Sequence, residues 1–301
     1  MYRWLSEKSR AEDKMISICE IGSTARGQND QLSDKDLLAI GSSHDVDIAV
    51  AKYRSSGWNV SRYSQTEFSE MARAHSLFVQ HVKQEGVLVR DDQGFLQETL
   101  GAYRPSRDYT SKLAAAIDPI RSALEIEQSY WGKLFQADIL YVSIRNACIL
   151  HKATVAEPEF DFESLVVWMC GTIGLTQSDR NSLLRLRALK HAYRARLTNM
   201  DVSIIAEIAS TARKLADYWT CFCGSSGSKF DLSNCYFEVR ALEGQLIRAV
   251  GPVFMDELER GHELGELWAT ICSTDPYKPR PPHLQRWSKS VSDFLSNRQS
   301  H

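Results

Sequence analysis

The sequence predicts a two-part protein, with an α/β domain at the N-terminal end followed by an all-helical bundle. Up to residue 104, short apolar runs with strand periodicity alternate with segments of helical periodicity. After the sequence Arg104-Pro105-Ser106-Arg107 every apolar pattern has helical spacing, and glycine-rich or polar breaks separate the segments. We therefore expect one domain over residues 1–104 and an α-helical bundle over residues 105–301.

The first domain is expected to combine short strands with short helices. The strands are predicted at residues 15–21, 35–41, 58–63 and 86–90. The helices are predicted at residues 3–14, 23–29, 44–54, 65–74, 75–85 and 95–103. Ser43 is a candidate cap for the helix that begins at residue 44.

The second domain is expected to contain helices only. They are predicted at residues 108–128, 130–155, 162–174, 178–198, 201–222, 235–259 and 261–272, with a short helix at 284–297 after an extended proline-containing stretch. A bundle of this kind buries one apolar stripe of each helix against its neighbours.

Length and charge exclude several classes of protein. The chain has 301 residues and a formal net charge of −2, so the chain as a whole is not typical of a nucleic-acid-binding protein. No apolar run reaches the roughly 18 residues that a membrane span needs. The N-terminus lacks the apolar core of a secretory signal. We therefore expect a cytoplasmic protein with no membrane partner.

One stretch of the first domain combines residues suited to binding phosphate and metal. Gly22 and Ser23 follow an apolar run, and Asp34 and Asp36 precede the next one. Gly22 permits close backbone approach, while the N–H and hydroxyl of Ser23, at a helix start, can hold a phosphate. Two carboxylates two residues apart lie on one face of a strand, and hard oxygen ligands suit Mg²⁺ carrying a nucleotide phosphate.

This order and spacing resemble the signature of the polymerase-β-like nucleotidyltransferase superfamily, above all its minimal and kanamycin-type members. The resemblance implies that residues 1–104 form a nucleotidyltransferase domain and that residues 105–301 are of the kanamycin-type C-terminal or HEPN-like kind. It implies Asp34 and Asp36 as catalytic ligands of Mg²⁺, with Gly22 and Ser23 binding a nucleoside triphosphate. Arg26 is either a further phosphate contact or an exposed helix arginine.

The chain departs from the family at the position of the third carboxylate. The family usually supplies this acid from the neighbouring strand, where residues 58–63 contain none. Kanamycin-type enzymes take the base from the helical domain instead, which makes Glu125 and Glu127 candidates. The departure leaves open either a working transferase or a domain that binds nucleotide without turnover.

A second motif lies in an apolar helix of the bundle. Arg145, Asn146 and His151 resemble the Arg–polar–x₄–His motif of HEPN-type domains, many of which are metal-independent RNases. The resemblance implies His151 as general acid or base, Arg145 on the scissile phosphate, and an RNA substrate. HEPN-like sites commonly need two copies, which implies a homodimer. The alternative is a buried Arg–His pair that satisfies polar groups within the bundle.

The basic run at residues 185–196 has two interpretations. Arg187, His191 and Arg194 can share one helix face, which can meet RNA or an acidic partner, or can simply be solvated.

Together these features predict Mg²⁺-dependent transfer of a nucleoside monophosphate, AMP from ATP, to a hydroxyl of a protein or small-molecule acceptor. The alternative is a toxin–antitoxin or defence protein with an RNase-type helical domain and a degenerate nucleotide-sensing first domain. A third interpretation is nucleotide-gated interaction with partner chains and no catalysis.

Overall fold

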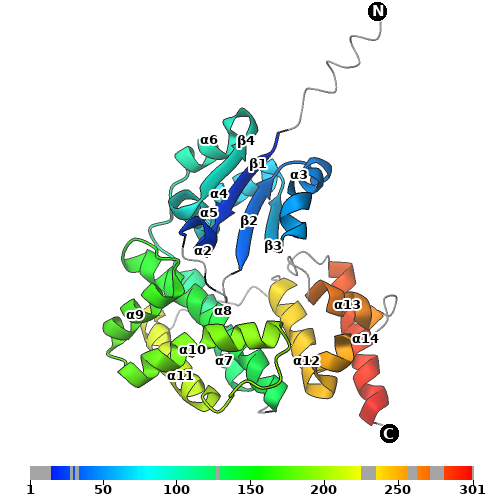
Figure 1. Ribbon diagram of the computed structural model, residues 1–301. Coiled ribbons are helices and arrows are strands. Elements are labelled where there is room, and N and C mark those ends of the chain that lie inside the picture. The colour runs from blue at the N-terminus through cyan, green and yellow to red at the C-terminus, as the bar shows by residue number, and fades with distance from the viewer. Residues whose placement is uncertain are drawn as a thin grey trace, which may run out of the picture. The chain divides into compact units, whose positions relative to one another are not determined.

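The chain divides into two compact units, Met1–Arg107 and Asp108–His301 (Figure 1). The computed structural model describes residues 15–27, 30, 34–126, 129–224, 235–256, 263–271 and 281–299. The first unit holds a small mixed sheet with its helices, and the second holds helices, so the predicted order of an α/β part followed by a helical part is confirmed. The division falls at Arg107 rather than at residue 104.

Four strands form the sheet of the first unit. They are β1 (Ser17–Ile21), β2 (Lys35–Ile40), β3 (Trp58–Tyr63) and β4 (Val87–Asp91). The strand order is β3-β2-β1-β4. β1 pairs antiparallel with both β2 and β4, and β2 pairs parallel with β3. The central strands β1 and β2 are covered on both faces, which explains their nearly continuous apolar sequences.

Helices cover the two faces of this sheet (Figure 1). They are α2 (Gly22–Ala25), α3 (Ser43–Ser55), α4 (Gln65–Arg73), α5 (Leu77–Glu85) and α6 (Phe95–Ala102), with the 3₁₀ turn η1 (Asp92–Gly94) before α6. Leu37 and Ala39 of β2 pack in the cluster that contains α3 residues, whereas Leu38 and Ile40 pack in the cluster with residues of α4, α5 and α6. The alternation of a strand thus builds two cores around one sheet.

Serine caps set several helix starts in the first unit. The cap of α3 is Ser42, whose hydroxyl accepts the Asp45 N–H, so the prediction of Ser43 was wrong. Ser64 and Glu67 form a capping box at α4. Ser76 caps α5, which begins at Leu77 because His75 has a φ of 53° and separates it from α4. The predicted helix at residues 3–14 lies outside the described residues.

The second unit is built from α7 to α14 (Figure 1). Their bounds are α7 (Thr110–Leu124), α8 (Tyr130–Val155), α9 (Phe162–Ile173), α10 (Gln177–Arg194), α11 (Ile205–Cys223), α12 (Cys235–Asp256), α13 (Glu263–Ile271) and α14 (Pro281–Gln299). α8 packs against α7, α9, α10, α11 and α12, and is therefore the central helix. α14 starts at Pro281, before the predicted start at residue 284, because proline is tolerated in the first turn of a helix.

The length and polarity of the helices bear on membrane insertion. Within the described ranges, the structure contains no helix with the combination of length and hydropathy required to cross a membrane.

Candidate functional site

The topology of the first unit brings four strand ends to one edge of the sheet. β1 ends where β2 begins, with Ile21 paired to Asp36. β3 runs parallel to β2, so Asn59 lies beside Asp36. β4 also starts at this edge, with Val87 paired to Glu20. The signature residues at the end of β1 and the start of β2 are therefore neighbours in space.

Gly22 lies directly against the carboxylate of Asp36. Its φ is +72°, and a Cβ built on Gly22 would lie 3.4 Å from Asp36 Oδ2. Glycine is favoured here because it adopts this left-handed conformation at little cost. Ser23 follows in the single turn of α2 and is half-buried. The structure thus places Gly22 and Ser23 directly after β1, next to the strand start that carries Asp36.

Asn59 is the residue of this edge whose role the sequence did not indicate. Its Nδ2 donates to Asp36 Oδ1 at 3.5 Å, from the adjacent position on β3. On β3, therefore, an amide rather than a carboxylate faces Asp36. An amide can orient Asp36, but it can neither ligate a metal as an anion nor serve as a base. The sequence did not supply the register of β3 against β2, which sets Asn59 opposite Asp36.

Asp34 is exposed and directly precedes β2, so it lies just outside the strand on which it was expected. Asp34 and Asp36 remain two residues apart at the same strand start. Within the described ranges no group of three or more His, Cys, Asp or Glu side chains could hold a metal ion. Two carboxylates nevertheless fit Mg²⁺, which typically takes one or two of them and completes its octahedron with waters and substrate phosphates.

Arg26 forms an ion pair with Glu85, the last residue of α5. His81, one turn earlier on α5, also contacts Glu85, with Nε2 and Oε2 3.0 Å apart. Burial raises the pKa of Glu85, but His81 and Arg26 outweigh that effect and hold this pKa below its ordinary value. The predicted phosphate contact of Arg26 stays a prediction, since the guanidinium is engaged by a carboxylate here.

The three residues of the RNase-type motif all lie on α8, but their side chains have different surroundings. Arg145 donates from Nη2 to the carbonyl of Phe160 at 2.8 Å, and Asn146 is exposed. His151 is 1% exposed, and its Nδ1 accepts from Trp219 Nε1 at 3.4 Å. Burial lowers the pKa of His151. The structure therefore does not gather these three side chains into an accessible site.

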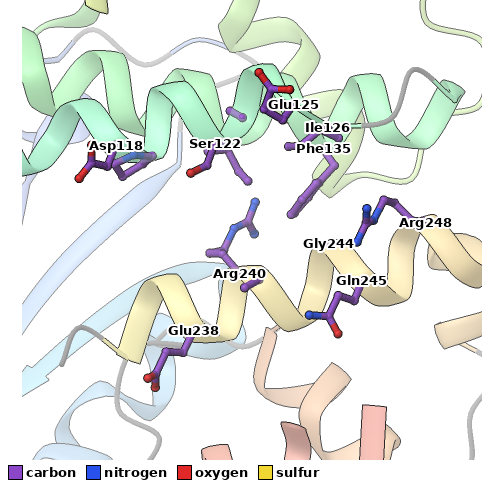
Figure 2. Close-up of a pocket in the computed structure, with 14 residues that line it drawn as sticks. Asp118, Ser122, Glu125, Ile126, Phe135, Glu238, Arg240, Gly244, Gln245 and Arg248 are labelled. Atoms are coloured by element: carbon purple, nitrogen blue, oxygen red, sulfur yellow. The ribbon is translucent and has the colours of Figure 1, made fainter. Parts of the chain in front are cut away.

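A cavity of about 700 Å³ lies in the helical unit between α7, α8 and α12 (Figure 2). Apolar atoms make up most of its lining surface, and Arg240 and Arg248 of α12 also line it. Glu125, the proposed substitute base, lines it too, whereas Glu127 lies outside the described residues. The sequence did not indicate this cavity, because it depends on how α12 packs.

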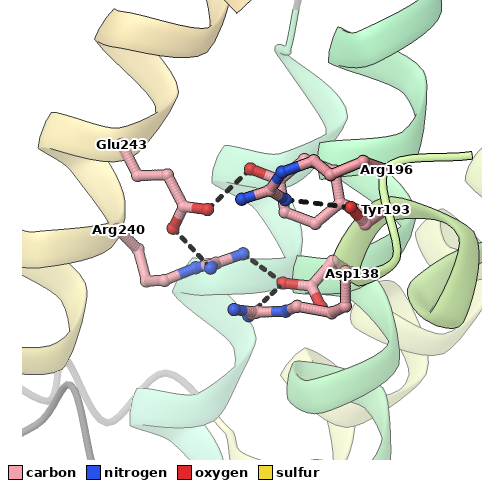
Figure 3. Close-up of polar contacts among 6 residues, drawn as sticks. Asp138, Tyr193, Arg196, Arg240 and Glu243 are labelled. Carbon is pink, nitrogen blue, oxygen red and sulfur yellow. Dashed lines mark hydrogen bonds and ion pairs between the residues drawn. The ribbon is translucent and has the colours of Figure 1, made fainter. Parts of the chain in front are cut away.

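Behind this cavity lies a buried charge network (Figure 3). Asp138 of α8 is 0% exposed and accepts from Arg194 Nε at 3.0 Å, Arg194 Nη2 at 2.7 Å, and Arg240. Arg240 also pairs with Glu243, which accepts from the Tyr193 hydroxyl at 2.6 Å. Burial raises the pKa of Asp138, but the two arginines outweigh it and hold this pKa below its ordinary value. Arg194 of the basic run is thus committed to a buried carboxylate.

Comparison with models of known protein families gave no match, and a comparison with curated proteins gave none either.

Proposed function

We propose that the first unit binds a nucleoside triphosphate with Mg²⁺ and transfers the nucleoside monophosphate, AMP from ATP, to a hydroxyl of a protein or small-molecule acceptor. The observation that carries this proposal is the position of Gly22 against the Asp36 carboxylate, at the strand ends that also hold Ser23 and Asp34. Nucleotidyl transfer requires that the triphosphate be bound next to a cation held by carboxylates.

Each residue has a defined role in the proposed reaction. Asp34 and Asp36 would hold Mg²⁺, which supplies charge neutralisation as pyrophosphate leaves. The open backbone at Gly22 and the hydroxyl of Ser23 would position the β- and γ-phosphates. Asn59 would keep Asp36 oriented through its 3.5 Å hydrogen bond. The acceptor hydroxyl would attack the α-phosphorus in line with the departing pyrophosphate, so that a new O–P bond forms as the bridging α–β P–O bond breaks and the hydroxyl proton passes to solvent.

Asn59 itself favours a second candidate, which is nucleotide binding without turnover. The residue beside Asp36 is an amide, which cannot act as the base that activates the acceptor hydroxyl. The unit would then report the presence of nucleotide rather than consume it.

The test is to incubate the full chain with Mg²⁺, a lysate as acceptor pool, and each nucleoside triphosphate labelled at either the α- or the γ-phosphate. The transferase predicts that α-label, and not γ-label, becomes covalently attached to an acceptor. Saturable binding by calorimetry without any attachment would support the sensor instead. Absence of both binding and transfer would contradict both candidates.

A further inference from the structure

The cavity of the helical unit has the dimensions and the wall of a small-molecule site. Its volume of about 700 Å³ lies within the range of about 300–1,000 Å³ typical of ligand pockets. The ring of Phe135, which is 2% exposed as a residue, points from α8 into the gap (Figure 2). The other apolar lining residues are Pro119, Ala123, Ile126, Ile139 and Ala241.

Arg240 forms a rigid part of this wall without adding net charge. Its guanidinium points from α12 into the gap (Figure 2) and lies 4.8 Å from the centroid of the Phe135 ring. Its charge is balanced by Asp138 and Glu243, both buried behind it. Arg240 is therefore held in place within the wall and leaves no unbalanced charge there for a ligand to meet.

Arg248 supplies the uncompensated positive charge of the cavity. It is exposed on α12 and, among the residues that the structure describes, makes no ion pair with a carboxylate. Figure 2 shows the carboxylates of Glu125 and Glu238 directed away from the gap, and Asp118 at the end opposite Arg248. The acidic lining residues thus leave the vicinity of Arg248 to an incoming anion.

From this arrangement we infer that the cavity binds a hydrophobic organic anion. Its apolar body packs against the accessible apolar wall formed by Ile126, Ile139 and Ala241, and its carboxylate or phosphate pairs with Arg248. This site is separate from the nucleotide site of the first unit, and the inference stands whether or not nucleotide transfer is observed.

The experiment measures binding of three probes that share one aromatic body and differ in charge: naphthaleneacetate, naphthaleneethanol and naphthaleneethylamine. Calorimetry on the full chain should give one site that prefers the acetate to the alcohol by about fivefold, as expected for one partly exposed charge pair. Arg248→Gln should abolish that preference and leave the affinity for the alcohol unchanged. Ala241→Trp, which fills the cavity from an exposed position, should weaken both by about tenfold or more.

Two matched variants control for surface effects. Ala249→Trp changes another exposed alanine of α12 that does not line the cavity, and Arg213→Gln removes an exposed arginine of α11. Both should bind the acetate like the unmodified chain, and all variants should keep its melting temperature. The inference would be overturned by no binding of the acetate, by equal affinity for all three probes, or by binding that Ala241→Trp leaves intact.

Discussion

Gly22, the residue directly after β1, and Asn59 of β3 are both neighbours of the Asp36 carboxylate. A Cβ at Gly22 would lie in van der Waals contact with Asp36 Oδ2, and the φ of +72° would strain any other residue there. Asn59 donates to the other oxygen from β3. If Asp36 holds Mg²⁺, Asn59→Ala should reduce metal-dependent nucleotide affinity by about ten- to a hundredfold, as removal of an orienting partner typically does. Titration calorimetry at varied Mg²⁺ concentration measures this affinity. An unchanged nucleotide affinity would show that Asn59 does not orient Asp36 for metal binding.

Gly86 is required by close packing where α5 meets β4. A Cβ at this position would collide with the carbonyl of Val82 and would lie 2.7 Å from Cys19 Sγ. Gly86→Ala should therefore lower the free energy of unfolding by about 1–3 kcal/mol. Gly101→Ala is the matched control, because nothing lies within 4 Å of its Cβ in α6 and the change should be neutral or stabilising. Urea unfolding of both variants measures the difference, and equal effects would contradict the packing argument.

His151 is a buried neutral imidazole rather than an accessible catalytic group. The rings of Trp168, Tyr218 and Phe222 surround it, with centroids 5.2, 5.6 and 4.4 Å away. Because burial lowers its pKa, the unfolded chain binds a proton more readily, and folding stability falls as the pH drops below the ordinary imidazole pKa of about 6.5.

His151→Phe should therefore lose less stability than the unmodified chain between about pH 7 and pH 5. At neutral pH the variant should be less stable by about 1 kcal/mol, because Trp219 loses its hydrogen-bond acceptor. Urea unfolding followed by tryptophan fluorescence checks both effects. A parallel pH dependence in the two proteins would show that His151 is not the buried titrating group.

At the scale of elements, apolar periodicity predicted nearly every helix and strand of the described residues, because both units bury their apolar faces in the usual way. The starts of helices were harder to predict. Ser42 rather than Ser43 caps α3, and two serines in succession give the sequence no means of choosing. Residues 58–63 were expected on the neighbouring strand, but the sequence did not give the register that sets Asn59 opposite Asp36. The buried network of Asp138 was missed because its members come from three distant helices.

Asp179 joins two helices through one carboxylate. It caps the start of α10 with Thr176, and it accepts from Thr211 and Lys214 of α11 at 2.8 Å each. The bond from Lys214 is the main reason that its pKa lies far below the ordinary value. A lowered carboxyl pKa contributes stability above the ordinary value of about 4, and that contribution is lost as the pH falls further.

Asp179→Asn should accordingly cost about 1–3 kcal/mol of stability at neutral pH, and the cost should shrink as the pH falls below about 4. Denaturant midpoints at neutral and acidic pH provide the measurement. Asp217→Asn on the exposed face of α11 is the control and should change little at either pH. A cost for Asp179→Asn that does not depend on pH would argue against the ionised carboxylate.

At the scale of the whole molecule, the chain consists of two units with separate cores. The sheet of the first unit has its own apolar clusters, and the Asp138 network lies wholly in the second. Hydrogen exchange should therefore respond within one unit at a time. Asp138→Asn leaves the buried Arg240 and the more exposed Arg194 without their shared carboxylate, at a cost of about 3–5 kcal/mol, and should accelerate exchange in α8, α10 and α12. The strands β1 to β4 should be unaffected, and faster exchange throughout both units would show that they fold as one.

The proposed transferase rests on the Asp36 carboxylate, and its removal is the most direct test. The rate of α-phosphate label transfer by the full chain should fall on the order of a hundredfold in Asp36→Asn, as expected for loss of a metal-binding charge. Asp47→Asn, the same change at an exposed carboxylate of α3, should leave the rate unaltered. If Asp36→Asn transferred the label as fast as the unmodified chain, the proposed role of Asp36 would be wrong.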